Sequence, residues 1–153
     1  MLSNDIALVT GASRGIGRAI AEALGEQGAT VVGTATSRSG AEVISERLAA
    51  AGVKGRGMVL DVTDPESIEQ LLNSVAESYG APSILVNNAG ITRDNLLMRM
   101  KDEEWNSIIE TNLTSLYRLS KACLRPMMKA RRGRIISIAS VVGATGNAGQ
   151  TNY

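Results

Sequence analysis

A glycine-rich segment near the start of the sequence, residues 10–17 (TGASRGIG), has the composition of a phosphate-binding turn. It lies between a short apolar run and the beginning of a helical pattern. Gly11, Gly15 and Gly17 let the backbone turn sharply and let a pyrophosphate approach closely. The helix that follows offers unpaired N–H groups and the positive end of its dipole to that anion. Glycine-rich turns also close ordinary loops, but the position between a strand and a helix favours nucleotide binding.

The residues after the second predicted strand indicate which nucleotide binds. NAD-binding domains place a carboxylate there for the adenosine ribose hydroxyls, whereas the next carboxylate in this sequence is Glu42. Arg14 in the turn and Arg38 after the strand can attract a 2′-phosphate, so we expect NADP(H); a solvated loop charge is the alternative for Arg38. Asp61 can accept a hydrogen bond from the adenine amino group with Val62 packed nearby, or Asp61 simply begins the turn into the next helix.

Five polar side chains further along the sequence have types suited to chemistry at a ligand. Asn87 and Asn88 end an apolar run, and amides at the carboxyl edge of a parallel sheet face the ligand crevice. Asn112 falls on an apolar helix face and needs a partner, for which core hydrogen bonding is the usual explanation. Ser140 closes the last predicted strand, where a serine is often only a cap, and Tyr153 follows thirteen positions later.

The sequence contains no histidine. This absence excludes Ser-His-Asp and Cys-His catalysis and histidine-based metal sites within these residues, and we expect no metal. Any proton transfer must therefore use tyrosine, lysine or a carboxylate.

The elements that must position these residues alternate between β-branched runs and helical patterns, which is typical of βαβ units and a parallel sheet. The apolar runs are continuous, so we expect both faces of the sheet to be covered. The predicted strands are residues 6–9, 30–36, 57–60, 84–87 and 134–138. Helices are predicted over residues 16–27, 41–51 and 102–131, the last of them long. A further helix is predicted to begin with a capping box at residues 63–66 and to end before Gly80. Pro126 is expected to kink or divide the long helix, and a glycine-rich loop follows at residues 143–149.

Composition and charge narrow the class of protein. Apolar residues make up 44% and charged residues 20% of the chain, as in an ordinary folded domain. No segment resembles a signal peptide or is long enough to span a membrane, and the lone Cys123 fits a reducing cytoplasm.

The charge is distributed unevenly along the chain. Residues 1–110 carry a net −6 and residues 111–153 a net +7. Lys129, Arg131 and Arg132 either complement the dipole at a helix C-terminus or form a docking patch for an acidic partner. Nucleic-acid binding is not expected, because Tyr117 is the only aromatic residue among those charges and gives no platform for stacked bases.

Together, these motifs resemble the short-chain dehydrogenase/reductase family over all 153 residues. Residues 10–17 are similar to the family's cofactor turn and residues 87–90 to its sheet-stabilising motif. Asn112, Ser140 and Tyr153 match three of its four catalytic positions in order and spacing. Residues 33–37, 88–97 and 143–152 resemble more specifically the bacterial reductases that act on 3-oxoacyl-[acyl-carrier-protein].

The resemblance implies NADPH-dependent reduction of the 3-keto group of an acyl chain held on acyl carrier protein, an acidic partner. It implies that Ser140 holds the keto oxygen, that Tyr153 donates the proton, and that Asn112 holds a water that relays protons. It also implies contact with the carrier near Arg131 and a homotetramer in the complete protein. The implied cofactor contacts are Gly11, Ala12, Ser13, Arg14, Gly15, Gly17, Thr36, Asp61, Val62 and Asn88.

The implied fold is a doubly wound (Rossmann) α/β sheet, of strand order 3-2-1-4-5 in these residues and 3-2-1-4-5-6-7 in a complete chain. The family also has a lysine four residues after the tyrosine, which lies beyond Tyr153. We therefore expect residues 1–153 to be a single NADP-binding domain truncated at the catalytic tyrosine, with little activity in that form. Two alternatives stay open, a reductase of the same group on coenzyme A and an inactive nucleotide-binding scaffold.

Overall fold

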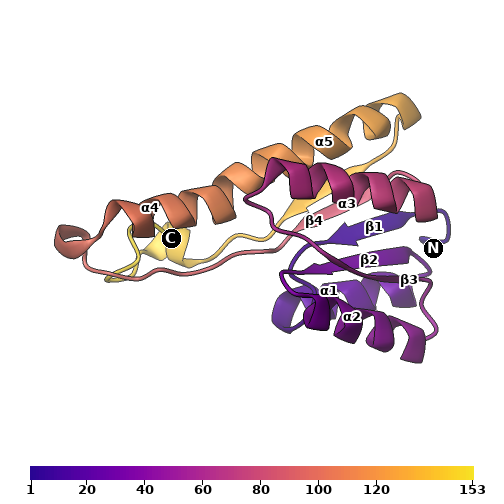
Figure 1. Ribbon diagram of the computed structural model, residues 1–153, viewed down its shortest axis with the longest axis horizontal. Coiled ribbons are helices and arrows are strands. Elements are labelled where there is room, and N and C mark those ends of the chain that lie inside the picture. Colours follow the sequence, from indigo (N-terminus) through magenta and orange to yellow (C-terminus); the bar gives the residue numbers. More distant parts are fainter.

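The computed structural model describes residues 1–153 as a five-stranded, wholly parallel sheet with helices on both faces (Figure 1). The strand order is β3-β2-β1-β4-β5. This order confirms the predicted doubly wound α/β fold. The strands are β1 (Ile6–Val9), β2 (Thr30–Ala35), β3 (Gly55–Val59), β4 (Ile84–Asn87) and β5 (Arg134–Ser137).

The helices form one layer on each face of the sheet (Figure 1). α1 (Gly15–Glu26) and α2 (Arg38–Ala50) pack on one face, and α3 (Pro65–Ser78) and α5 (Ser115–Ala130) cover the other. Side chains of a strand point alternately to its two faces, so Leu8 joins the cluster under α3 and α5, whereas Val9 joins the cluster under α1 and α2. Both clusters share the central strand β1, which fixes the positions of the segments that leave its carboxyl end.

Hydroxyl and carboxylate caps decide where α2 and α3 begin. The Ser37 hydroxyl accepts a hydrogen bond from the Gly40 N–H, so α2 begins at Arg38, three residues earlier than predicted. The predicted capping box at residues 63–66 does not form, because Asp64 rather than Thr63 caps α3 by accepting from the Glu66 N–H.

The long helix predicted over residues 102–131 is interrupted, but at a different place from the one expected. α4 (Asp102–Ile108) leads into a π-helical segment, η2 (Ile109–Thr114), and α5 follows it. Pro126 lies inside α5 and the helix continues to Ala130, so a division of the helix at Pro126 is wrong, whereas a kink there stays a prediction. The irregularity falls instead around Asn112, and π-helical turns are frequent at functional sites.

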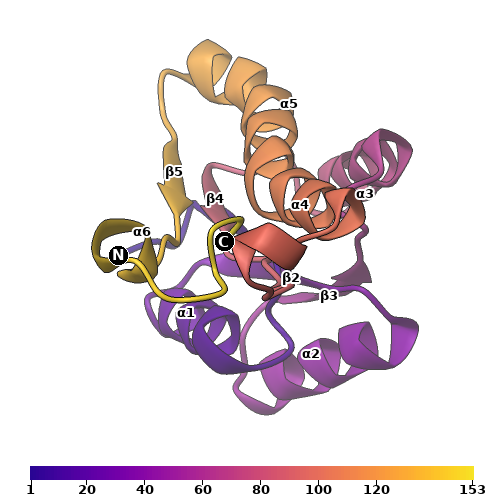
Figure 2. The same cartoon turned by 90° about the vertical axis from the view of Figure 1, so that its left-hand side faces the viewer.

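The expectation that both faces of every strand are covered holds only in the middle of the sheet. All of β4 and nearly all of β1 and β2 are buried, whereas all four residues of β5 are exposed and only Met58 of β3 is buried. β3 and β5 are the two edges of the sheet, where one neighbour is missing (Figure 2).

Two smaller boundaries near the carboxyl end of β5 also differ from expectation. β5 ends at Ser137, so Ser140 lies in the loop beyond the strand rather than closing it. Part of the predicted glycine-rich loop is a short helix, α6 (Val142–Thr145). Elsewhere in the chain, a single helical turn, η1 (Leu97–Arg99), precedes α4. None of the helices has both the length and the apolar content to cross a membrane.

Candidate active site

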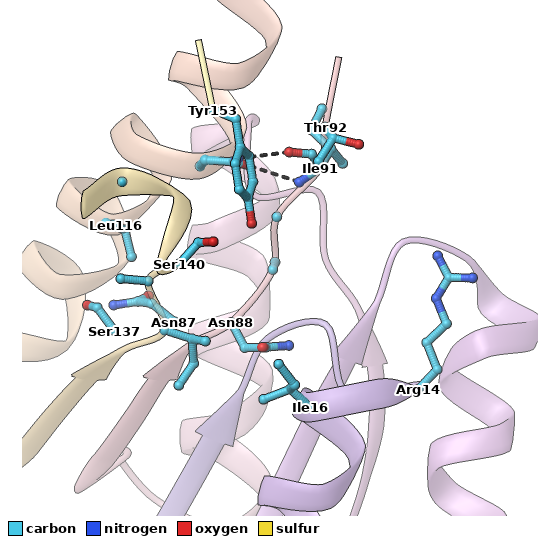
Figure 3. Close-up of a pocket in the computed structure, with 16 residues that line it drawn as sticks. Arg14, Ile16, Asn87, Asn88, Ile91, Thr92, Leu116, Ser137, Ser140 and Tyr153 are labelled. Atoms are coloured by element: carbon cyan, nitrogen blue, oxygen red, sulfur yellow. Dashed lines mark hydrogen bonds between the residues drawn. The ribbon is translucent and has the colours of Figure 1, made fainter. Parts of the chain in front are cut away.

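A cavity of about 760 Å³ lies at the carboxyl edge of the sheet (Figure 3). Segments that are far apart in the sequence line it: the end of β4, the start of α1, η2, the loop after β5 and the last residue. Five of the predicted site residues therefore come together in one hollow, namely Arg14, Asn88, Asn112, Ser140 and Tyr153. Open α/β sheets bind their ligands at this edge.

The glycine-rich turn leaves the amino end of α1 open. Gly11 and Gly15 have φ of +62° and +59°, a conformation that glycine adopts without cost. Arg14 occupies the N-cap position with no side-chain cap, and the first turn of α1 carries no acidic residue. A Cβ on Gly15 would meet nothing within 4 Å. Unpaired N–H groups, a positive helix end and open space fit the pyrophosphate of a dinucleotide.

Gly17 is required by packing rather than by conformation. A Cβ at this position would overlap the carbonyl of Gly11 and the amide nitrogen of Asn88. The first turn of α1 can therefore lie against the strand-to-helix turn only because residue 17 has no side chain.

Asn88 holds the glycine-rich turn from the neighbouring strand. Its Nδ2 donates to the carbonyls of Thr10 and Gly11, at 3.2 and 3.0 Å. The buried Thr10 hydroxyl in turn accepts from the N–H groups of Asn88 and Ala89, both at 3.0 Å. The predicted cofactor residue Asn88 thus also fixes the turn on which the cofactor would rest.

The partner that the Asn112 amide requires is the backbone of Ile91. Asn112 Oδ1 accepts from the Ile91 N–H and Nδ2 donates to the Ile91 carbonyl, both at 2.9 Å. Figure 3 marks these two bonds as dashed lines at Ile91. The loop held in this way contributes Ile91 and Thr92 to the cavity wall. Asn112 therefore shapes the cavity from the π-helical segment, and its role in a water relay stays a prediction.

The hydroxyls of Ser140 and Tyr153 are both free to bind a ligand. Ser140 Oγ accepts from the Val142 N–H at 3.2 Å, which leaves its proton available. The Tyr153 hydroxyl makes no hydrogen bond within residues 1–153 and points into the cavity in Figure 3. Two hydroxyls at one cavity can act together on a single carbonyl oxygen.

The remaining predicted cofactor residues lie outside this cavity, along the carboxyl ends of β1, β2 and β3. Ala12 and Val62 are buried, whereas Thr36 is exposed just after β2. Asp61 Oδ1 accepts from both the N–H and the hydroxyl of Thr63 and so begins the turn into α3, while its contact with the adenine amino group stays a prediction. Ser13 lies in the glycine-rich turn itself.

The two arginines proposed for a 2′-phosphate differ in their surroundings. The Arg14 side chain extends away from Ser140 and Tyr153 (Figure 3), on the side that leads from the turn towards α2. Arg38 is the first residue of α2, and its side chain is 90% exposed, with only Glu42 nearby at 3.8 Å. The exposure of the Arg38 side chain agrees with the alternative given for this residue, a solvated loop charge.

Two residues near the site were missed in the sequence. Arg47 of α2 donates from Nη1 to the Ser13 carbonyl at 2.6 Å, which ties the turn to α2. Asn152 is 6% exposed and bonds three backbone groups around Tyr153. No motif in the sequence marks Arg47, whereas Asn152 directly precedes the predicted site residue Tyr153, and that position could have drawn attention to it.

Arg131 lies apart from the cavity, at the opposite end of α5 (Figure 1). It adopts a left-handed conformation with φ 52° and ψ 31°. A separate cleft of about 430 Å³ is lined there by Met128, Arg131, Arg132 and Arg134, among others. α5 has 16 residues, so Arg131 at its end lies roughly 24 Å from the π-helical segment.

A parallel sheet with an open glycine-rich turn at its carboxyl edge, and with free hydroxyls in the adjoining cavity, defines a nucleotide-binding α/β protein with a candidate active site. The sequence model of the short chain dehydrogenase family matches residues 5–153. The chain belongs to the short chain dehydrogenase family, as its motifs predicted.

Three bacterial proteins that are similar to this chain share one name, and that name states an activity. The chain is similar to 3-oxoacyl-[acyl-carrier-protein] reductase FabG of Vibrio harveyi, with 68% identity over 152 residues, which are 99% of this chain and 61% of that protein. The reductases of the same name from Escherichia coli K12 and Pseudomonas aeruginosa are 67% and 66% identical over 148 and 152 residues. These regions cover 97% and 99% of this chain, and 59% and 62% of those proteins. The chain therefore spans about three fifths of the length of these relatives.

Proposed function

We propose that the protein reduces the 3-keto group of 3-oxoacyl-[acyl-carrier-protein] to the 3-hydroxyacyl thioester with NADPH. The observation that carries the proposal is the gathering of Asn112, Ser140 and Tyr153 around one cavity next to the open end of α1. The names of relatives that are 66–68% identical supply the substrate. In this proposal, residues 1–153 form the NADP-binding domain. The proposal also includes a cytoplasmic location, because the single cysteine, Cys123, is a free buried thiol.

The amino end of α1 and its glycine-rich turn would hold the pyrophosphate, and Asn88 and Arg47 keep that turn in place from β4 and α2. When bound, NADPH supplies the hydride. The absence of a carboxylate between β2 and Glu42 favours NADPH over NADH, because a carboxylate there would repel a 2′-phosphate, whereas Arg14 attracts it. Thr36, Asp61 and Val62 would adjoin the adenosine end.

Ser140 and Tyr153 would act on the keto oxygen of the substrate. Charge develops on that oxygen during reduction, and the free Ser140 hydroxyl can hold it by a hydrogen bond. The Tyr153 phenol donates the proton as general acid. Because a free tyrosine has a pKa of ~10, rapid proton exchange near neutrality requires positive charge beside the phenol.

The proposal gives the basic surface at the end of α5 to the acidic carrier protein. Arg131, Arg132 and Arg134 lie around the cleft there, and the carrier would contact Arg131. Because Arg131 lies roughly 24 Å along α5 from the π-helical segment at the cavity, a carrier docked at Arg131 has to extend its acyl chain along the helix or present it to a second subunit. The proposal also includes a homotetramer, and the exposed apolar residues Leu113 of η2 and Tyr117 of α5, which do not line this cleft, support assembly with further copies.

The test is NADPH oxidation by the full natural chain, followed at the nicotinamide absorbance, with acetoacetyl groups on acyl carrier protein and on coenzyme A. The proposal predicts turnover of both thioesters, faster on the carrier protein, and a loss of roughly 10²- to 10⁴-fold for Tyr153→Phe, the range expected for a general acid. Equal or faster turnover of the coenzyme A thioester would favour the alternative substrate. NADPH binding without oxidation of NADPH would favour the scaffold.

A further inference from the structure

The carboxamide of Asn152 uses each of its hydrogen-bonding groups on backbone atoms. Nδ2 donates to the carbonyls of Arg93 and Glu104, at 2.8 and 3.2 Å, and Oδ1 accepts from the Tyr153 N–H at 2.9 Å. The residue is 6% exposed, so water does not replace these bonds. A buried amide with all its groups satisfied holds its neighbours in one geometry. The backbone of Tyr153 is therefore tied to the segment between β4 and α4.

That segment is also held at the cavity wall by a second side-chain amide. Asn112 binds both backbone groups of Ile91, two residues before Arg93. Ile91 and Thr92 line the cavity, and Thr92 lies between the residues to which Asn112 and Asn152 attach, Ile91 and Arg93. The wall of the cavity and the backbone that carries the Tyr153 phenol are thus held by two amides that approach from different parts of the chain.

A further backbone contact joins the same two segments. The Asn95 N–H donates to the Gly149 carbonyl at 2.8 Å, and Asn95 Nδ2 donates to Glu104 Oε1 at 3.3 Å. The chain from Gly149 to Tyr153 therefore lies along residues 93–104 rather than extending freely from α6. Asn152 is the buried member of this contact and the one next to Tyr153.

We propose that Asn152 is a positioning residue for Tyr153, which it couples to the loop between β4 and α4. The inference rests on the proposed function, in which Tyr153 is the proton donor. The Tyr153 phenol makes no hydrogen bond of its own within residues 1–153, so its position follows from its backbone and packing. Removing the Asn152 amide leaves the Tyr153 N–H and the Arg93 and Glu104 carbonyls without this partner, and the loop and the tyrosine separate.

The expected consequence is a slower chemical step with unchanged cofactor binding. A displacement of about 1 Å at a reacting group can cost roughly 10²-fold in rate. Asn152 has no hydrogen bond to the glycine-rich turn or to α1. We therefore expect Asn152→Ala to lower kcat roughly 10- to 100-fold, while the Kd for NADPH stays within about twofold.

The experiment compares Asn152→Ala with Asn147→Ala in the full natural chain. Asn147 is an exposed asparagine of the same loop whose side chain bonds only the Gln150 side chain, at 2.6 Å, and it does not line the cavity. The readouts are kcat and KM with acetoacetyl-coenzyme A, the NADPH Kd from nicotinamide fluorescence, and deuterium exchange of residues 91–95. Asn147→Ala should match the unmodified protein in all of them, whereas Asn152→Ala should lose kcat and exchange faster at residues 91–95.

Each alternative outcome has one meaning. A kcat for Asn152→Ala within about twofold of the unmodified protein overturns the inference. A parallel loss of kcat and NADPH affinity also overturns it, because that pattern shows general loosening of the fold. If Asn152→Ala does not fold, the isosteric Asn152→Asp takes its place. Asn152→Asp keeps the acceptor for the Tyr153 N–H and removes both donors, so the inference requires that it lowers kcat. Full kcat in Tyr153→Phe would instead refute the proposed function, independently of Asn152.

Discussion

Replacing Gly17 with alanine tests whether the first turn of α1 lies against the glycine-rich turn as the structure has it. In an ordinary helix interior, alanine is more stabilising than glycine by about 1 kcal/mol. At Gly17, the new Cβ would overlap the Gly11 carbonyl and the Asn88 Nδ2. The carbonyl is backbone and cannot rotate away, so α1 has to move outward or the turn has to open. Helix propensity therefore predicts that Gly17→Ala raises the free energy of unfolding, whereas the packing in the structure predicts that it lowers it.

The magnitude follows from the contacts that the added methyl group disturbs. Overpacking of this kind costs about 1–3 kcal/mol, and each of the two hydrogen bonds from Asn88 Nδ2 contributes about 1 kcal/mol. These losses come to about 3–5 kcal/mol, and the higher helix propensity of alanine offsets about 1 kcal/mol of them. We therefore expect Gly17→Ala to lower the free energy of unfolding by about 2–4 kcal/mol. The displaced turn should also weaken NADPH binding at least tenfold, which corresponds to about 1.4 kcal/mol.

The assay is urea unfolding followed by circular dichroism, with the slope of the transition checked for constancy. Gly15→Ala is the matched control, because its Cβ meets nothing within 4 Å and only its φ of +59° opposes the substitution. The control should lose about 1–2 kcal/mol, the cost of a left-handed non-glycine residue. A Gly17→Ala protein as stable as the unmodified one, or more stable, would refute the packing of α1 against this turn.

Three further predictions concern other parts of the molecule. Arg132→Ala should lower the free energy of unfolding by about 2–4 kcal/mol, because it leaves the 4% exposed Asp5 carboxylate with Ser83 as its only side-chain partner. Asp5→Ala should cost less, because the Arg132 side chain is 57% exposed and water can solvate it. Urea unfolding of both variants checks this order, and the reverse order would contradict it. Burial raises the pKa of Cys123 from 9.0 to about 11. The folded protein therefore binds this proton more tightly than the unfolded chain, and its stability should fall by about 2–3 kcal/mol as pH rises from 9 to 11. Cys123→Ala, measured in parallel, should lack that part of the slope, and identical slopes would exclude a buried thiol. Arg131→Glu should raise KM for the carrier-protein thioester roughly tenfold or more and leave the coenzyme A thioester unaffected; equal effects on both would remove Arg131 from the docking surface.

The middle of the fold was predictable because its local signals agree with its environment. β1 and β4 have the predicted boundaries, since short runs such as Ala7, Leu8 and Val9 are wholly apolar and wholly buried. The edge strand shows where this reasoning fails. Ile135 and Ile136 have the same apolar pattern but are 39% and 44% exposed, because β5 is an edge strand with no neighbour beyond it. The apolar pattern alone does not show this, whereas the predicted strand order 3-2-1-4-5 does.

The irregularity in the long helix depends on tertiary structure. Proline gave a strong local reason to place a break at Pro126, yet α5 passes through that residue. The π-helical segment instead surrounds Asn112, which reaches across to Ile91, 21 positions earlier. A local pattern contains no information about that partner.

The candidate site divides in the same way. Glycine spacing and the order of Asn112, Ser140 and Tyr153 pointed to residues that the structure gathers at one cavity. The residues that hold them were not foreseen, since Asn152 bonds a carbonyl 59 positions away. The Asp5–Arg132 ion pair spans 127 positions. Side chains that touch a ligand follow short motifs, whereas side chains that support them follow from long-range packing.

Titration of the full natural chain with NADPH and NADH at low salt, followed by nicotinamide fluorescence, is the most direct test of the open amino end of α1 as a dinucleotide site. Saturable binding is expected for NADPH, tighter than for NADH because Arg14 and the lack of a carboxylate after β2 favour a 2′-phosphate, and Gly17→Ala should weaken it. If folded protein takes up neither coenzyme, the glycine-rich turn is only structural and the proposed reductase activity falls with it.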